Sequence, residues 1–178
     1  MNLPNKLTMF RIFLIPVFII FMKLPIEAGN IIALIIFIAA SLTDTADGYI
    51  ARKYNLVTDF GKFMDPLADK LLVCSAMILF VETGQLASWI VIIIISREFI
   101  ISGFRLIAVD NGIVIAASMW GKVKTVCQMV MIITLIWNLP FYWFFVLQQI
   151  LIYASLILTV VSLVDYLVKN KQVLSGKK

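Results

Sequence analysis

Four aspartates in two pairs are the residues of this chain best placed to do chemistry. Asp44 and Asp47 form one pair, and Asp65 and Asp69 form the other. On helices the two carboxylates of a pair lie about 60° and about 40° apart around the axis, so each pair shares a face. Clustered carboxylate oxygens are the ligands that hard divalent cations such as Mg²⁺ or Mn²⁺ prefer. The spacing therefore predicts a divalent metal site, and four carboxylates suit two ions that assist phosphoryl displacement.

Small residues and one arginine stand among these aspartates. Gly48 and Gly61 fall in apolar segments, where a glycine inside a helix costs about 1 kcal/mol relative to alanine. The small residues Gly48, Gly61 and Ala51 would be explained if a ligand approaches the helix backbone closely at these positions. Arg52 can bind a phosphate through two parallel hydrogen bonds. The spacing leaves an alternative open, in which the glycines only allow tight packing of helices.

A second, cationic set follows later in the chain. It consists of Arg97, Arg105, Lys122 and Lys124, with Arg11 from the opening segment. Arg97 and Arg105 are eight residues apart, about 80° around a helix, so both can face one cavity. Cations near a metal site predict an acceptor that carries its own phosphate. The alternative is that these residues are interfacial charges with their stems in lipid, and Glu98 is expected to neutralise one of the arginines.

The composition places this chemistry in a membrane. Of 178 residues, 62% are hydrophobic and only 14% are charged, whereas a soluble domain has about 45–50% and about 25%. This excludes a water-soluble enzyme and a nucleic-acid-binding protein, so we relate the net charge of +5 to membrane topology. The chain has no histidine, which excludes a His-ligated zinc and a Ser-His-Asp triad. Proton transfer is left to Asp, Glu, Lys, Tyr or Cys.

Six apolar stretches are long enough to be helices that position these residues. They predict an all-α integral membrane protein with six transmembrane helices, forming a single domain over residues 1–178. An interfacial segment is expected at 1–11 and a basic tail at 169–178. The predicted helices cover residues 12–22, 30–52, 61–82, 87–109, 117–138 and 141–168.

The distribution of Lys and Arg predicts the orientation. With six spans both termini lie on one side, and Lys23 is the single basic residue expected on the other side. Both termini are therefore predicted to be cytoplasmic, in a multi-pass protein of the cell membrane whose active site faces the cytoplasm. A divalent-cation transporter is the alternative from another class. It would need polar groups that continue to the opposite face, and the sequence has almost none there.

The two aspartate pairs also carry a family resemblance. The segment from residue 44 to residue 69 reads D-x₂-D-G-x₂-A-R-x₈-G-x₃-D-x₃-D. It resembles the signature of the CDP-alcohol phosphatidyltransferases at all eight fixed positions. Three further stretches, at 2–11, 96–105 and 121–125, are similar to bacterial members of that family that use glycerol 3-phosphate.

The resemblance implies a reaction and a role for each motif residue. A phosphatidyl group would pass from CDP-diacylglycerol to glycerol 3-phosphate in a membrane-bound homodimer with no nucleic-acid partner. Asp69 would be the general base, in addition to being a metal ligand. The acceptor phosphate would be bound by the cationic set, which is Arg97, Arg105, Lys122, Lys124 and Arg11. Two divalent cations, Mg²⁺ or Mn²⁺, would be held by Asp44, Asp47, Asp65 and Asp69, and the CDP site would be lined by Gly48, Ala51, Arg52 and Gly61. Inositol phosphate, serine and phosphatidylglycerol stay open as alternative acceptors.

Overall fold

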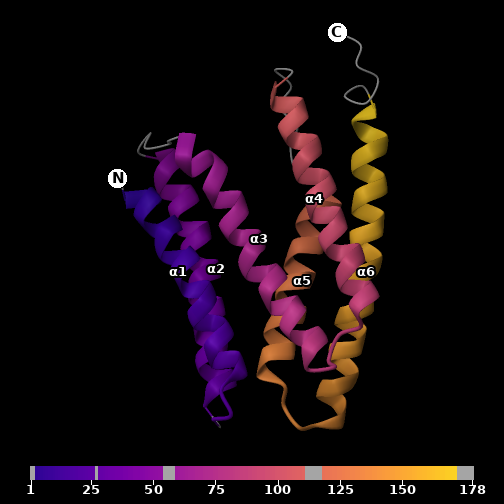
Figure 1. Ribbon diagram of the computed structural model, residues 1–178. Coiled ribbons are helices and arrows are strands. Elements are labelled where there is room, and N and C mark those ends of the chain that lie inside the picture. The colour runs from indigo at the N-terminus through magenta and orange to yellow at the C-terminus, as the bar shows by residue number, and fades with distance from the viewer. Residues whose placement is uncertain (1–2, 27, 54–58, 111–117, 172–178) are drawn as a thin grey trace. The chain divides into compact units, whose positions relative to one another are not determined.

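A computed structural model of the chain describes residues 3–26, 28–53, 59–110 and 118–171. Side chains are described over these ranges except at 3–4, 44–53, 59–63, 65–66 and 109–110. The described residues form six α-helices and no strand (Figure 1). The helices are α1 Leu3–Lys23, α2 Gly29–Lys53, α3 Asp59–Glu82, α4 Ser88–Asp110, α5 Met119–Trp137 and α6 Tyr142–Lys169.

These helices confirm the predicted all-α architecture, with one difference at the start of the chain. Residues 1–11 were expected to form an interfacial segment separate from the first apolar helix. Instead α1 runs without interruption from Leu3 to Lys23, so the helix begins before the predicted start at residue 12, while the interfacial position of residues 1–11 stays a prediction. The physical reason is that Pro4 stands in the first turn of α1. Backbone N–H groups in a first turn have no partner within the helix, so a proline there costs no hydrogen bond.

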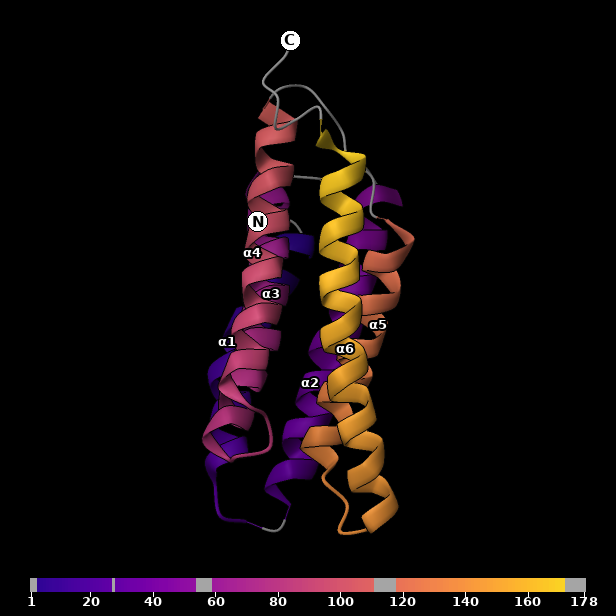
Figure 2. The same cartoon turned by 90° about the vertical axis from the view of Figure 1, so that its right-hand side faces the viewer.

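The helices group into two compact units. The first unit comprises Met1–Thr83 with Ile132–Trp137, and the second comprises Gly84–Met131 with Asn138–Lys178. In the first unit α1 packs against α2 and α3, and α4 packs along α6 in the second (Figures 1 and 2). The aspartate segment therefore belongs to the first unit, and most of the cationic set belongs to the second.

The first unit is held together by a regularly spaced face of α1. Phe18 packs against Phe37 of α2 with ring centroids 6.0 Å apart, a distance typical of favourable aromatic pairs. Towards the beginning of α1 the same buried face becomes polar, with Thr8 and Arg11 almost fully enclosed. A buried arginine is rare unless it has a partner, so this half of α1 has a task beyond apolar packing.

The second unit is built around α6. One face of this helix is buried, and its members recur every three or four residues, as the helical period requires. They are Phe144, Gln148, Ile152, Ser155, Thr159, Ser162 and Tyr166. The small hydroxyl residues in the middle of this face let a neighbouring helix approach closely, and they place polar groups inside an apolar bundle.

Within the described ranges three helices are long and apolar enough to cross a membrane: α1, α5 and α6. Their outer faces carry large exposed hydrophobic side chains such as Phe13, Val126 and Ile157, which only lipid or another protein can cover. The protein is therefore membrane-embedded. The apolar stretches of α3 and α4 are interrupted by charged residues, among them Asp69 and Arg97.

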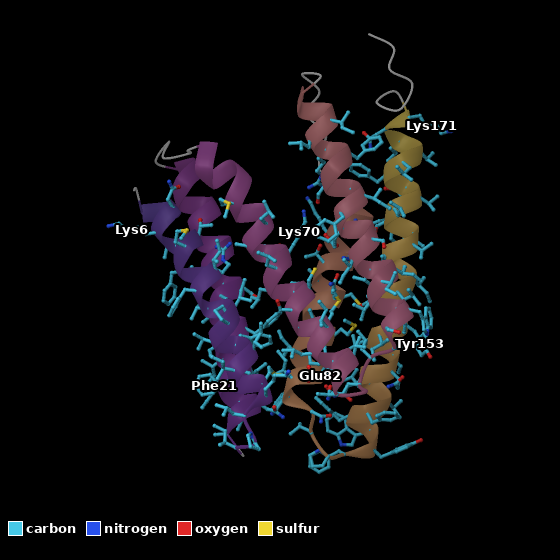
Figure 3. The ribbon with its side chains drawn as sticks, in the orientation of Figure 1. Lys6, Phe21, Lys70, Glu82, Tyr153 and Lys171 are labelled. Carbon is cyan, nitrogen blue, oxygen red and sulfur yellow. The ribbon has the colours of Figure 1, made fainter. Side chains whose placement is uncertain are left out.

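An exposed ion pair joins the ends of α1 and α3. Lys23 Nζ lies 3.0 Å from Glu82 Oε1, and both side chains are more than half exposed (Figure 3 labels Glu82). We expect Glu82→Gln to lower the free energy of unfolding by less than about 1 kcal/mol, because exposed pairs are screened by water. Thermal unfolding in detergent with and without the substitution measures this, and a loss several times larger would contradict it.

Candidate functional site

The aspartate segment lies on two consecutive helices of the first unit. Residues 44–52 belong to the last turns of α2, and residues 61–69 belong to the first turns of α3. Both halves are helical, so the angular spacing predicted for each pair of carboxylates holds for the backbone. Most predicted ligands lie outside the described side chains; these are Asp44, Asp47, Gly48, Ala51, Arg52, Gly61 and Asp65.

Asp69 is the one motif aspartate whose side chain is described. It is half-buried on α3, between the enclosed Ala68 and Leu72. Among the described side chains no group of three acidic or cysteine residues could hold a metal ion. This is expected, because Asp69 is the one motif carboxylate of four whose side chain is described. The donor set fits a hard divalent cation by its chemistry, since it offers carboxylate oxygens from adjacent turns of two helices in one unit.

A buried cluster of charges lies in the second unit, between α4, α5 and α6. We call Arg97, Glu98, Lys124 and Ser162 the Glu98 cluster. Glu98 Oε1 accepts a hydrogen bond from Arg97 Nη1 at 3.2 Å and another from Lys124 Nζ. Arg97 Nε donates to Ser162 Oγ at 3.1 Å. Side chains from α4 and α5 therefore meet at one carboxylate, and Ser162 of α6 holds Arg97 beside it.

The cluster carries a net positive charge in a nearly enclosed place. Arg97 is 8% exposed and Lys124 only 1% exposed, so Lys124 does not extend to solvent as an interfacial lysine would. Each buried ion costs several kcal/mol of desolvation unless its partners compensate. Within the cluster Glu98 carries one negative charge against the two positive charges of Arg97 and Lys124. Glu98 thus does what the sequence led us to expect, and it serves Lys124 as well.

The start of α5 is shaped to bring Lys124 and Arg97 together. Gly121 N–H donates to Ser118 Oγ at 3.2 Å, which satisfies one of the free N–H groups in the first turn of a helix. A Cβ atom at Gly121 would lie 3.5 Å from Arg97 Nη2. The Arg97 guanidinium therefore lies beside the backbone of α5, one turn before Lys124, at a distance that an added Cβ would meet as an ordinary van der Waals contact.

The remaining predicted acceptor residues are placed differently. Arg105 is exposed, and its guanidinium carbon lies 5.8 Å from the centroid of the Tyr166 ring, within the range of a cation–π contact. Lys122 is exposed on α5. Arg11 is buried in the first unit, so the structure groups it with the helices of the aspartate segment and not with the Glu98 cluster.

Two residues of α6 were missed by the sequence analysis. Ser162 holds Arg97, and Tyr166 lies under Arg105. A signal for both was available, because Ser162 and Tyr166 fall on the same three- and four-residue repeat as the buried positions of α6. Polar residues at core positions of an apolar helix need a partner, so both positions could have been predicted to face charged or polar groups.

The family comparison identifies the class of protein that these features define. The sequence model of the CDP-alcohol phosphatidyltransferases matches residues 1–161, and the chain belongs to this family. It is an enzyme of that class, and the family is generally dependent on divalent cations.

Individual relatives within this family are similar to the chain over more than nine tenths of its length. The chain is 46% identical to a Bacillus subtilis protein over 97% of both chains. It is 45% identical to one from Haemophilus influenzae, over 93% of this chain and 91% of the relative. A third, from Escherichia coli K12, is 40% identical over 93% of each. All three are named CDP-diacylglycerol–glycerol-3-phosphate 3-phosphatidyltransferase.

Proposed function

We propose that this protein transfers a phosphatidyl group from CDP-diacylglycerol to glycerol 3-phosphate, giving phosphatidylglycerophosphate and CMP. The names of its relatives support the two substrates. The observation that carries the choice of acceptor is the Glu98 cluster, because two enclosed cations share one carboxylate. An acceptor with its own phosphate can pair with such cations, whereas serine carries no phosphate.

The chain's residues divide between the two substrates. In the second unit Arg97 and Lys124 bind the phosphate of glycerol 3-phosphate, and Arg105 adds positive charge nearby. In the first unit Asp69 accepts the proton of the attacking hydroxyl, since a chain without histidine offers carboxylates for that task. The hydroxyl oxygen then bonds to the phosphorus on the lipid side, and the bond from that phosphorus to the oxygen of CMP breaks.

The motif residues serve the CDP moiety and the metal. Two divalent cations, Mg²⁺ or Mn²⁺, would be held by the four motif aspartates and would neutralise the negative charge of the diphosphate. Arg52 pairs with a phosphate oxygen, and Gly48, Ala51 and Gly61 allow the nucleotide to approach the helix backbones. The support for this assignment is the motif and its helical spacing on α2 and α3.

We further propose that all six helices span the cell membrane, with both termini and the active site on the cytoplasmic side, as a homodimer. The distribution of Lys and Arg supports the orientation. Labelling of single cysteines placed at residue 24 and in the 172–178 tail, from each side of sealed vesicles, tests it. Equal accessibility of both positions from one side would overturn the orientation.

An acceptor panel tests the reaction itself. Purified protein in detergent receives CDP-diacylglycerol, Mg²⁺ and one acceptor at a time: glycerol 3-phosphate, inositol phosphate, serine or phosphatidylglycerol. Release of CMP together with phosphatidylglycerophosphate is expected with glycerol 3-phosphate alone. Turnover with inositol phosphate or serine instead would overturn the acceptor, and no CMP release with any of them would overturn the reaction.

Removal of divalent cations is expected to stop the reaction without unfolding the protein. A chelator should lower CMP release to background, and added Mg²⁺ or Mn²⁺ should restore it, because the diphosphate charge is otherwise uncompensated. Detergent-phase size exclusion of the chelated protein provides the control for folding. Full activity after exhaustive chelation would contradict the metal assignment.

A further inference from the structure

The hydroxyl group of Tyr166 is enclosed on α6 and has no task in the packing of the protein. Tyr166 is 2% exposed, and its Oη atom has no hydrogen-bond partner in the part of the chain that the structure describes. Buried tyrosine hydroxyls usually find a partner, because leaving one without a hydrogen bond is costly. A buried hydroxyl without a partner therefore calls for an explanation outside the packing of the chain.

The ring of Tyr166 explains its own burial, but not the hydroxyl. Phe104 contacts the ring edge-on with centroids 5.7 Å apart, and Ile101 completes a small apolar core with them. Leu163 and Leu167 pack against this core. A phenylalanine would fill the same space with the same contacts, so the Oη atom adds nothing to the stability of the cluster.

The surroundings of the ring are cationic. The Arg105 guanidinium carbon lies 5.8 Å from the ring centroid, and Arg97 lies within electrostatic range of both Arg105 and Tyr166. One turn earlier on the same face of α6, Ser162 accepts a hydrogen bond from Arg97. The face of α6 that holds Arg97 in the Glu98 cluster thus continues to Tyr166 and Arg105.

The acidic groups nearby are already engaged with cations. Glu98 contacts Arg97 and Lys124, and Asp165 pairs through Oδ1 with Lys169 at 2.6 Å, while its Oδ2 has no hydrogen-bond partner among the described residues. Two arginines attract an anion to this end of α6, and a phenol supplies a hydrogen-bond donor that a phosphate oxygen accepts well. An anionic ligand is therefore the partner whose chemistry fits the Tyr166 hydroxyl best.

We propose that Tyr166 is an acceptor-binding residue, whose hydroxyl donates a hydrogen bond to a phosphate oxygen of the acceptor beside Arg97 and Arg105. This inference rests on the proposed function, in which those cations bind the acceptor phosphate. It makes α6 the third helix of the acceptor site, with Ser162 positioning Arg97 and Tyr166 contacting the ligand.

Tyr166→Phe removes the hydroxyl alone and tests the proposal. The KM for glycerol 3-phosphate is expected to rise about tenfold, since hydrogen bonds to charged groups are among the stronger ones. The KM for CDP-diacylglycerol and the unfolding temperature without ligand should stay unchanged. Tyr153→Phe is the matched control, because Tyr153 is on the same helix with its side chain 53% exposed (Figure 3). An unchanged acceptor KM in Tyr166→Phe would overturn the proposal.

A second measurement does not depend on turnover. Glycerol 3-phosphate and inorganic phosphate should each raise the unfolding temperature of the wild type, because a ligand that binds the folded state stabilises it. The midpoint concentration for this shift should be about tenfold higher in Tyr166→Phe. Equal midpoints in both proteins would overturn the role of Tyr166. Absence of product from glycerol 3-phosphate in the wild type would instead overturn the proposed function, and the phosphate titration would still test Tyr166.

Discussion

Asp69→Asn is expected to lower the rate of CMP release by about a thousandfold or more, with glycerol 3-phosphate and CDP-diacylglycerol both saturating. The substitution keeps the shape of the side chain but removes its negative charge and its ability to accept a proton. General-base catalysis alone contributes about 10²–10⁴ in rate, and the variant loses a metal ligand as well. The measurement is a radiolabelled CMP-release assay on protein in detergent.

The control for Asp69→Asn is another carboxylate of the same helix. Glu82 is exposed at the end of α3. Within the described part of the chain it forms an ion pair with Lys23, which is also exposed. Glu82→Gln should therefore retain wild-type turnover while removing one charge from α3. Asp69→Asn should also elute from size exclusion as the wild type does. If it retains a tenth of the wild-type rate, Asp69 is neither the base nor an essential ligand.

Lys124→Met is expected to raise the KM for glycerol 3-phosphate roughly thirtyfold or more while leaving the KM for CDP-diacylglycerol unchanged. Lys124 is enclosed and contacts Glu98, so its removal leaves the cluster without excess positive charge. Truncating one member of a buried, hydrogen-bonded charge pair costs about 2–5 kcal/mol in binding. The acceptor dependence of CMP release at fixed CDP-diacylglycerol gives both constants.

A double substitution separates binding from stability. Lys124→Met removes one of the two cations that contact Glu98 and should lower the free energy of unfolding by about 3 kcal/mol. Adding Glu98→Gln removes the carboxylate that lost its partner, so part of this loss should return. The acceptor KM should stay high, because the lysine is still absent. If the double variant recovers the wild-type KM, Lys124 acts only through the stability of the cluster.

The second unit shows how a membrane protein can enclose two cations beside one carboxylate. Arg97 and Lys124 share one oxygen of Glu98, and Ser162 holds the other edge of the Arg97 guanidinium. The carboxylate compensates enough charge for the helices to pack, while the excess attracts an anion. Removing Glu98 would therefore be expected to harm folding and acceptor binding together, which is why the double variant is informative.

Much of the fold follows from local sequence patterns. From α2 onward the helix ends agree with the predicted apolar ranges within two residues, because a long apolar stretch between breakers such as Pro25 or Pro140 has few alternatives to a helix. The earlier start of α1 has a local cause too, since the first turn of a helix accepts a proline such as Pro4.

The candidate site also has one part that follows from local sequence and one part that depends on tertiary contacts. The aspartate segment occupies 26 consecutive positions, so its residue types and spacing could be recognised without any tertiary structure. The acceptor site could be predicted only as a set of cations. Which of them meet depends on contacts between residues far apart in the chain, such as Lys124 with Glu98 and Arg97 with Ser162.

Composition, helical period and motif spacing are local properties, so the amino-acid sequence alone is enough to predict a helical membrane protein with a carboxylate-rich segment suited to divalent cations and phosphoryl transfer. The packing of the helices was needed to learn that Arg97 and Lys124 share Glu98, that Arg11 belongs to the unit of α2 and α3, and that α6 brings Ser162 and Tyr166 to the arginines. The physical reason is that helix packing chooses among the faces that each helix offers, and no single stretch of sequence records that choice.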